Sequence, residues 1–292
     1  MTTKLKVMVF GADGMLGHQL VKRLALSHEV VATVRKFPTD VVSAALKDSR
    51  LITGVDVRGQ DALDIVLAER PQVAVNAAGI VKQREADPIE GIEVNSLYPH
   101  RLARICRQAD ARLIHISTDC VFSGARGNYR EADSPDPLDV YGRTKLLGEV
   151  SGQGCLTLRT SMVGLELANY SSLVEWFLRQ KGQVHGYRRV IWSGLTTIEL
   201  ARVIDRLILG QPELDGLWHV SGQPISKYEL LAKLKVMLGR DVVVVPDDGI
   251  VIDRSLNSER FRSAVGYDCP TNEAMLSELV VAVREREEKG IA

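Results

Sequence analysis

Short apolar runs alternate with amphipathic stretches through the first half of the chain, and this alternation limits the possible folds more than any other feature. The runs are almost entirely apolar, which is typical of strands buried on both faces of a parallel sheet. Between them, apolar residues recur at helical spacing, as Leu16, Leu20 and Leu24 do. The pattern predicts an α/β fold built on a doubly wound parallel sheet. We expect strands at 6–10, 29–34, 73–77, 113–117 and 155–159, and helices at 15–25, 62–69, 92–108 (interrupted near Pro99) and 141–150.

The second half is less regular and predicts a smaller α/β region. Helical patterns cover 173–180, 197–209, 227–238 and 272–287, and short strands are expected at 217–220 and 242–245. With 292 residues the chain is long enough for two domains. We therefore predict a first domain over 1–165 and a second region over 166–292, part of which returns to pack on the first.

Composition excludes several classes of protein. The 37 Lys+Arg balance the 37 Asp+Glu, whereas a nucleic-acid binder usually carries a basic surplus. No apolar run is long enough for a signal peptide or a membrane span. We expect a soluble cytoplasmic protein, a monomer or homodimer, that binds neither membranes nor nucleic acids. No metal site or disulfide framework is expected, because the four cysteines are scattered without metal-ligand spacing: Cys106, Cys120, Cys155 and Cys269.

Three glycines, Gly11, Gly14 and Gly17, separate the first expected strand from the first helix. Glycine permits backbone angles that other residues avoid and lets the chain approach a pyrophosphate closely, while free N–H groups at the start of the helix bind the anion. The spacing is G-x-x-G-x-x-G rather than G-x-G-x-x-G, but the strand before and the helix after supply the context that a dinucleotide site requires. We predict a Rossmann-type dinucleotide site that also includes the other loop residues, Asp13, Met15 and Leu16.

The residues after the second strand indicate which dinucleotide is bound. An NAD site places an acid there for the ribose 2′-OH, whereas an NADP site uses Arg. The sequence has Arg35 and Lys36 at this point and no acid. We therefore predict NADPH, with Arg35 on the 2′-phosphate; NADH is the alternative, and a solvated surface role for Arg35 stays open. Asp56 and Val57, after the expected third strand, are predicted to meet the adenine, unless Asp56 only caps a turn.

Tyr141 and Lys145 lie four residues apart and therefore on one face of the expected helix. A phenol has a pKa of about 10 and exchanges protons poorly near neutrality, but a neighbouring ammonium stabilises the phenolate and lowers that pKa. Thr118 ends an expected strand, where residues face the ligand crevice and a hydroxyl can stabilise a developing oxyanion. The three residues suit the reduction of a carbonyl, although each alone also fits an ordinary surface or turn position.

A series of short motifs lies between residues 6 and 164: GADGMLG (11–17), VNAAG (75–79), VNSLYP (94–99), ISTDCVFSG (116–124), YREAD (129–133), PLDVYGRTKLLGE (137–149) and LRTS (158–161). In order and spacing these motifs resemble the extended short-chain dehydrogenases/reductases, and most closely the dTDP-4-dehydrorhamnose reductase family. The second half matches more loosely, at 194–197, 217–221 and 254–257. The resemblance implies an NAD(P)H-dependent enzyme that reduces the 4-keto group of a nucleotide-activated 4-keto-6-deoxy sugar.

The resemblance also implies roles for individual residues. Tyr141 is the acid/base that protonates the new alkoxide, Lys145 tunes Tyr141 and holds the nicotinamide ribose, and Thr118 hydrogen-bonds the substrate carbonyl. The further cofactor residues are Gly11, Gly14, Gly17, Ala77, Ala78, Gly79, Asn95 and Ser117. The further substrate residues are Cys120, Val121, Phe122, Met162 and, as a basic residue of the second half, Arg254.

Two positions depart from the family's pattern and keep other functions open. Cys120 stands where the reductases have Tyr and the related 4,6-dehydratases have Glu, so dehydration is disfavoured. Met162 replaces a Trp that helps to position the sugar, which leaves the sugar and its nucleotide undetermined. The alternatives are a nucleotide-sugar epimerase or dehydratase that keeps NAD bound, and a non-catalytic regulatory or cofactor-sensing subunit on the same fold.

Overall fold

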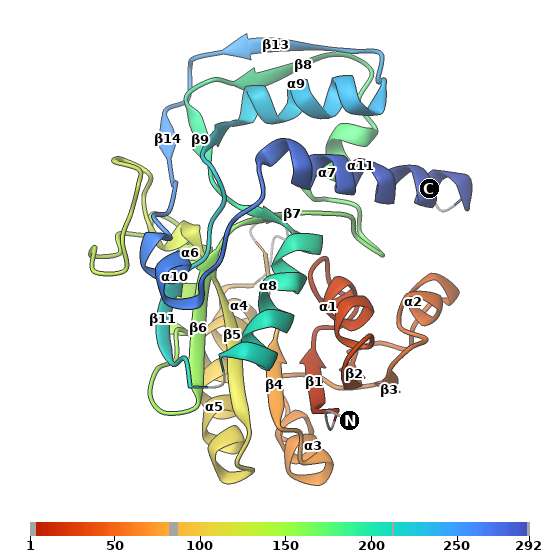
Figure 1. Ribbon diagram of the computed structural model, residues 1–292, viewed down its shortest axis with the longest axis vertical. Helices are drawn as coiled ribbons and strands as arrows, with labels where there is room; N and C mark the ends of the chain where they lie inside the picture. The colour runs from red at the N-terminus through yellow and green to blue at the C-terminus, as the bar shows by residue number, and fades with distance from the viewer. Residues whose placement is uncertain (1–3, 82–86, 212, 291–292) are drawn as a thin grey trace.

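A seven-stranded sheet forms the centre of the larger half of the molecule (Figure 1). The structure is a computed structural model that describes residues 4–81, 87–211 and 213–290. The strand order is β11-β6-β5-β4-β1-β2-β3, and every neighbouring pair is parallel. Because the order reverses beside β1, the predicted doubly wound, Rossmann-type sheet is confirmed. The strands are β1 Lys6–Phe10, β2 Glu29–Thr33, β3 Arg50–Ile52, β4 Val73–Asn76, β5 Arg112–Thr118, β6 Cys155–Thr160 and β11 Gly216–His219.

Helices cover both faces of the sheet because successive strand residues point to opposite faces. Val7 and Val9 of β1 pack in one core with α1 and α8, whereas Met8 and Phe10 pack in the other core with α3 and α5. All four side chains are fully buried, and burial of each contributes about 1.5–3 kcal/mol. The alternation therefore fixes which face of β1 meets which helices. These helices are α1 Gly17–Leu24, α3 Asp61–Glu69, α5 Tyr98–Gln108 and α8 Thr197–Gly210.

The segment 92–108 has no break at Pro99, contrary to the prediction. Ile92–Leu97 forms a π-helix, η1, and α5 continues it directly, with Pro99 in its first turn. Proline is tolerated there because the first N–H groups of a helix have no intrahelical acceptor. The irregularity thus lies before the proline, in the turn that carries Asn95.

The smaller half has a core of its own, lined by α7, α9 and α11 and covered by the parallel pair β8 and β13 (Figure 1). A short three-stranded sheet, β12-β9-β14, and the pair β7 and β10 connect this core to the larger half. The main elements are α7 Leu173–Leu178, β8 Gly182–Tyr187, β9 Val190–Trp192, β12 Ile225–Ser226, α9 Lys227–Leu238, β13 Val242–Asp247, β14 Ile252–Asp253 and α11 Asn272–Glu288. The remaining elements are α2 Asp40–Ala45, α4 Pro88–Gly91, η2 Asp119–Val121, α6 Val140–Leu147, β7 Met162–Val163, β10 Leu195–Thr196 and α10 Glu259–Val265.

Several elements of the second half pack with the larger half: α8 and α10 share the core that contains α1, and β11 extends the sheet beyond β6. The open side of β11 is covered by side chains, since Arg260 Nη1 donates to Leu217 O at 2.9 Å and His219 N donates to Glu131 Oε1 at 3.0 Å. An edge protected in this way offers few free backbone groups to another chain. Part of the second half thus returns to the first.

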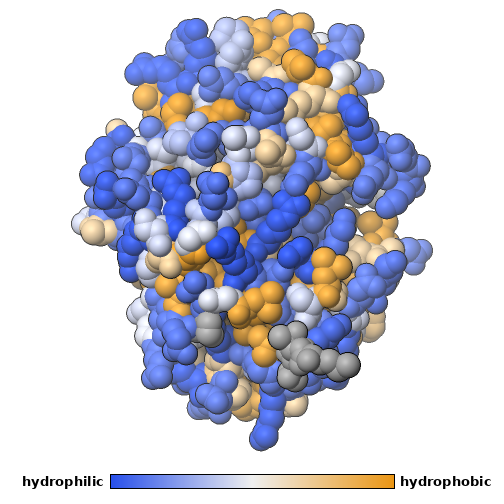
Figure 2. Space-filling model, in the orientation of Figure 1, coloured by the Kyte–Doolittle hydropathy of each residue, from blue (hydrophilic) through white to orange (hydrophobic). Residues whose placement is uncertain are grey.

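The molecular surface is predominantly polar on the face shown in Figure 2, where apolar residues gather only in small groups. In the ranges 4–81, 87–211 and 213–290, no helix combines the length and the apolar character needed to cross a membrane.

Candidate active site

The glycine-rich loop between β1 and α1 is packed too closely for side chains at two of its glycines. Gly11 has a φ of +73°, and a Cβ atom on it would lie 2.8 Å from Ala78 Cα. A Cβ on Gly17 would lie 2.0 Å from the carbonyl oxygen of Gly11. Gly14 N donates to that same oxygen at 3.0 Å and closes the turn. The loop presents bare backbone beside the end of β4, which fits the pyrophosphate of a dinucleotide.

The side chains around the loop have different surroundings. Asp13 is exposed, Met15 is half-exposed, and Leu16 packs in the core beside α1, so only the backbone of Leu16 is available to a cofactor. His18 belongs to no motif, yet its Nδ1 donates to Gly14 O at 2.8 Å. Burial lowers the pKa of this imidazole. Because a carbonyl oxygen can only accept, the neutral ring carries its proton on Nδ1 and braces the loop.

Two arginines and two acids meet where β2 and β3 end. Arg35 Nη1 lies 3.3 Å from Glu90 Oε1, and Arg58 Nη2 lies 2.6 Å from Asp56 Oδ2. The hydrogen bonds from Arg58 lower the pKa of the Asp56 carboxyl to about 2. Val57 is half-buried against the core of α3 and α5. Arg58 is thus a second cation beside Arg35 at the ends of β2 and β3, which we call the rim of the cofactor site. The sequence alone did not indicate this position for Arg58.

Asn95 ties the end of β4 to α6. Its Nδ2 donates to Ile80 O at 3.0 Å and to Thr144 Oγ1 at 3.2 Å, and its Oδ1 accepts from Ile80 N at 2.9 Å. The residue is 2% exposed. Ala77 and Ala78, which precede the tied segment, are half-buried. Asn95 therefore holds the wall of the predicted cofactor groove in place through the backbone.

Thr118, Tyr141 and Lys145 come together at the end of β5. The side chain of Thr118 lies close enough to the Tyr141 hydroxyl to influence its proton affinity. Lys145 Nζ donates to Ile116 O at 2.6 Å, and a Cβ on Gly79 would lie 3.9 Å from this Nζ. The phenol, the hydroxyl and the ammonium therefore share the crevice at the carboxyl edge of the sheet.

Burial dominates the proton affinities of this group. It raises the pKa of the Tyr141 phenol, Cys120 adds to the rise, and the nearby Thr118 side chain opposes it. Burial also lowers the pKa of the Lys145 ammonium to about 8. The Lys145 ammonium donates to the Ile116 carbonyl in this structure, and its expected effect on the pKa of Tyr141 stays a prediction.

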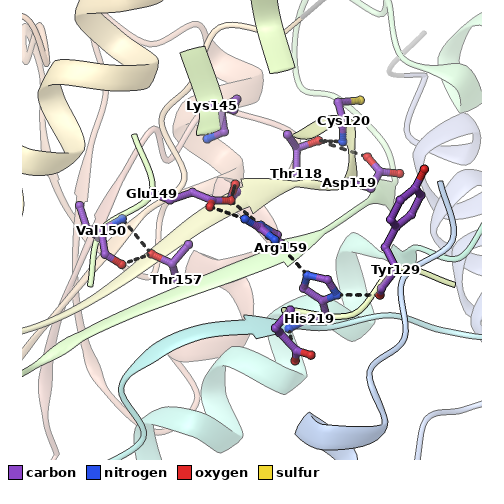
Figure 3. A network of polar contacts seen from close by, with 12 residues as sticks. Thr118, Asp119, Cys120, Tyr129, Lys145, Glu149, Val150, Thr157, Arg159 and His219 are labelled. Atoms are coloured by element: carbon purple, nitrogen blue, oxygen red, sulfur yellow. Dashed lines mark hydrogen bonds and ion pairs between the residues drawn. The ribbon is translucent and has the colours of Figure 1, made fainter. Parts of the chain in front are cut away.

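A buried polar network lies next to these residues (Figure 3). The Glu149 carboxylate accepts from Ser117 Oγ at 2.7 Å and from two nitrogens of Arg159, each at 2.7 Å. Arg159 Nη1 lies 3.4 Å from His219 Nε2, and His219 Nδ1 donates to Tyr129 O at 3.0 Å. Ser117, a predicted cofactor residue, directs its side chain into this network. Glu149 and Arg159 stand in the quoted motifs, but the motifs alone gave them no role.

Two predicted substrate residues keep their side chains in the interior. Val121 and Phe122 are both 0% exposed, and Phe122 stacks on the Tyr129 ring with the centroids 4.1 Å apart. The Phe122 carbonyl oxygen accepts from Arg254 Nε at 2.9 Å. In this structure the two residues support the site from the inside, and Arg254 is anchored to one of them.

The remaining substrate residues flank Thr118. Arg254 Nη1 lies 3.9 Å from Cys120 Sγ, and burial, with a contribution from Asp119, raises the pKa of the Cys120 thiol to about 12. Met162 packs half-buried beside the core of α1 and α8. Asp119 was not predicted to act, but it is 7% exposed and its Oδ1 accepts from Thr118 Oγ1 at 3.2 Å. Its place between two predicted substrate residues was the available signal.

The described residues contain no group of three or more His, Cys, Asp or Glu side chains arranged to hold a metal ion.

Comparison with known protein families decides the family. The sequence model described as "RmlD substrate binding domain" matches residues 5–241. The chain belongs to this family. The match includes the glycine-rich loop, Thr118, Tyr141 and Lys145, and it confirms the resemblance that the motifs indicated. As predicted, this RmlD-family chain is an NAD(P)-dependent oxidoreductase of the short-chain dehydrogenase/reductase class.

Individual relatives of this RmlD-family chain differ in what their names describe. The dTDP-4-keto-6-deoxy-D-glucose reductase of Streptomyces niveus is 29% identical over 263 residues, which cover 83% of each protein. Subunit beta of methionine adenosyltransferase 2 from Bos taurus is 26% identical over 242 residues, 77% of this chain and 70% of that protein. The crystal structure of dTDP-4-dehydrorhamnose reductase from Bacillus anthracis, in complex with NADP, covers 97% of this chain and 99% of its own, with a TM-score of 0.78 and 22% identity. At 22% identity, the similarity to this crystal structure shows that the two chains share a fold.

Proposed function

We propose that this chain uses NADPH to reduce the 4-keto group of a nucleotide-activated 4-keto-6-deoxy sugar. The observation that carries the proposal is the meeting of Thr118, Tyr141 and Lys145 at the carboxyl edge of the sheet, the same edge that holds the glycine-rich loop. The 29% identity to a dTDP-4-keto-6-deoxy-D-glucose reductase supports the substrate class.

Tyr141 is the proton donor in this proposal. Burial raises the pKa of the phenol, so its proton stays on Oη until a stronger base is within reach. A carbonyl oxygen becomes such a base as negative charge develops on it. NADPH, when bound, supplies the hydride. Thr118 Oγ1 donates to the same oxygen after it leaves Asp119 Oδ1, its present acceptor at 3.2 Å.

Lys145 supplies positive charge beside the phenol. With a pKa of about 8, the side chain is mostly an ammonium at neutral pH. It is held by Ile116 O and faces Gly79, from where it can donate to a ribose hydroxyl and to the phenolate left after proton transfer. Asn95 maintains this arrangement by bonding Thr144, the residue before Lys145.

The choice of NADPH rests on the cationic rim formed by Arg35 and Arg58. A guanidinium can bind a phosphate through two parallel hydrogen bonds. Both arginines are paired with acids in the structure, Arg35 with Glu90 and Arg58 with Asp56, so a 2′-phosphate has to compete with these carboxylates. We therefore expect a preference for NADPH over NADH of only about tenfold, the size of one charged hydrogen bond.

The deciding experiment is NADPH consumption by the purified protein with 4-keto-6-deoxy sugars linked to dTDP, UDP and GDP. Turnover in the wild type is expected to fall about 100- to 10,000-fold in Tyr141→Phe, which removes the proton donor. Tyr187→Phe, at a half-buried tyrosine of β8, is the matched control and should retain the wild-type rate. Equal turnover in the wild type and Tyr141→Phe would contradict the proposal, as would no turnover with any of the sugars.

A second candidate is a non-catalytic regulatory subunit, and the similarity to methionine adenosyltransferase 2 subunit beta favours it. The arrangement of Thr118, Tyr141 and Lys145 favours the reductase, because a regulatory subunit has no need of a proton donor beside an ammonium. Fluorescence titration with NADPH separates the two. Measurable binding without turnover on the whole panel would support the regulatory role.

A further inference from the structure

A lysine of the smaller half, Lys227, faces the strand end that carries Thr118. It is the first residue of α9, and its Nζ lies 5.2 Å from the centroid of the Trp192 ring. Burial lowers the pKa of the ammonium, while the nearby Asp119 and Cys120 act in the opposite direction. The positive charge therefore lies beside the active-site residues of the larger half, while the side chain remains partly exposed.

A series of contacts fixes the position of this ammonium. The Trp192 indole donates from Nε1 to Ser161 Oγ at 3.0 Å. The Ser161 side chain also lies close enough to Asp119 to favour its charged form, and Asp119 Oδ1 accepts from Thr118 Oγ1 at 3.2 Å. Ser161 thus lies between the indole under the ammonium and the carboxyl beside Thr118. Lys227 and Asp119 are neighbours as a result, although they come from different halves of the chain.

Lys227 has hydrogen-bonding capacity that the protein does not use. An ammonium carries three donors. Across the described residues, Nζ makes a cation–π contact with Trp192 and has no hydrogen bond or ion pair. A partly desolvated charge without an acceptor is costly. A ligand atom that accepts from Nζ would remove that cost.

The neighbouring acid selects the kind of ligand atom. A diphosphate beside Lys227 would also lie beside Asp119, and two acidic groups so close repel each other. A hydroxyl group differs, because it accepts from the ammonium and donates to the carboxyl at the same time. A sugar hydroxyl therefore matches the Lys227–Asp119 pair better than a phosphate does.

We propose that Lys227, together with Asp119, binds the hydroxyl on the ring carbon next to the reacting carbonyl and so determines specificity. This inference rests on the proposed function. In the proposed function Thr118 Oγ1 donates to the carbonyl oxygen of the substrate. Asp119 Oδ1 lies 3.2 Å from the same Thr118 Oγ1. The hydroxyl oxygen on the neighbouring ring carbon would then lie beside Asp119 and Lys227. The enzyme should accordingly prefer a ketone with a free hydroxyl beside it.

The proposal is tested by measuring two substrates, the hydroxy ketone and its deoxy analogue, with both the wild type and Lys227→Met. Lys227→Met keeps an unbranched stem over Trp192 and removes the charge and the donors. The wild type is expected to prefer the hydroxy ketone over its deoxy analogue by about 10- to 100-fold in kcat/KM, the size of one charged hydrogen bond. In Lys227→Met the preference should fall to about threefold or less, since the two changes remove the same contact. The Kd for NADPH should stay at the wild-type value.

Lys233→Met is the matched control, because Lys233 lies on the same helix but lines a separate groove with Thr271 and Glu273. It should keep the full preference for the hydroxy ketone. An undiminished preference in Lys227→Met would overturn the proposal. An equal loss of affinity for both ketones and for the free nucleoside diphosphate would also overturn it, because Lys227 would then bind the diphosphate.

Calorimetric titration distinguishes a failure of this inference from a failure of the proposed function. It compares a nucleoside diphosphate with the corresponding nucleotide sugar that carries the hydroxyl. Absence of turnover would count against the proposed function alone. Loss of the extra affinity due to the sugar in Lys227→Met, with unchanged affinity for the nucleoside diphosphate, would still support the hydroxyl contact. If Lys227→Met leaves the extra affinity intact, the assignment of Lys227 is wrong.

Discussion

The two ends of the candidate site are constructed in different ways. At the cofactor end, backbone groups of one short loop are exposed because Gly11 and Gly17 leave no room for side chains. At the substrate end, side chains from both halves of the chain converge on Thr118, with Lys227 and Arg254 coming from the smaller half. The cofactor end, which is made of backbone groups, depends on the local conformation of one loop. The substrate end, which is made of side chains, depends on how distant elements pack. Substitutions at the two ends should therefore fail in different ways.

The largest effect is expected beneath the substrate end. Arg159→Met should lower the free energy of unfolding by about 3 kcal/mol, because it leaves the mostly buried Glu149 carboxylate without its bidentate partner. Urea denaturation measures this change. Arg50→Met breaks an ion pair with Glu69 whose arginine is 60% exposed, and it should cost less than about 1 kcal/mol. Similar losses in both variants would show that the network does not support the substrate end.

The next effect concerns the cofactor end. Gly17→Ala should raise the Kd for NADPH about 100-fold, because its Cβ would displace the Gly11 carbonyl and shift the loop. Fluorescence titration gives the Kd, and circular dichroism checks that the variant is folded. Gly210→Ala is the control, since a Cβ there would meet nothing within 4 Å. A wild-type Kd in Gly17→Ala would contradict the view that bare backbone makes this end.

Lys145, at the substrate end, is expected to lower the free energy of unfolding. The pKa of Lys145 is about 8 in the folded chain and about 10.4 when unfolded, so the folded state disfavours the ammonium. Lys145→Met should raise the free energy of unfolding at pH 7 by about 1–2 kcal/mol, once the lost bond to Ile116 is deducted. This gain should be constant below pH 8 and disappear as the pH rises towards 10.4. Denaturation across pH tests it against Lys22→Met, at an exposed lysine of α1, and a pH-independent difference would refute it.

The smallest effect is expected at the rim of the cofactor end. Arg35→Ala should lower kcat/KM for NADPH about tenfold and leave that for NADH unchanged, because only NADPH carries the 2′-phosphate. Steady-state kinetics with both cofactors gives the comparison. Lys36→Ala, at the exposed neighbouring residue, should change neither value by more than about twofold. If the wild type uses both cofactors equally and Arg35→Ala does not alter this, the assignment of Arg35 is wrong.

The same difference between the ends explains how far the sequence predicts this structure. The expected strands at 6–10, 29–34 and 73–77 are runs of mostly apolar residues, and the first helix repeats apolar residues at helical spacing, so these elements can be recognised in the sequence. The strands β7, β9, β10, β12 and β14 have two or three residues each, which is too short for any period to show. The glycine-rich loop is a local feature and was predicted as such. Part of the return of the second half to the sheet was also expected, although no motif specified which strand would do so.

The side-chain contacts of the site were less accessible to prediction. Lys227 lies at the start of a predicted helix, but nothing near it in the sequence indicates that Trp192 and Asp119 will surround it. The role of Asn95 depends on the π-helical turn before Pro99, whereas the sequence predicts a helix interrupted near Pro99 and does not specify the π-helical turn. The sequence likewise gives no sign that Lys145 of α6 donates to Ile116 O, because this acceptor lies on β5, a distant part of the chain.

The position of β11 has a consequence for how this scaffold can diversify. In the sequence β11 follows α7 and β8 of the smaller half, yet it forms one edge of the seven-stranded sheet of the larger half. A segment that ended at residue 165 would expose the whole edge of β6, whose residues are all buried. Substrate-recognition segments are therefore interleaved with scaffold segments, and they cannot be exchanged by a single crossover between related genes. New sugar specificities on this fold should arise through point substitutions around Thr118 and Lys227 more readily than through recombination of whole domains.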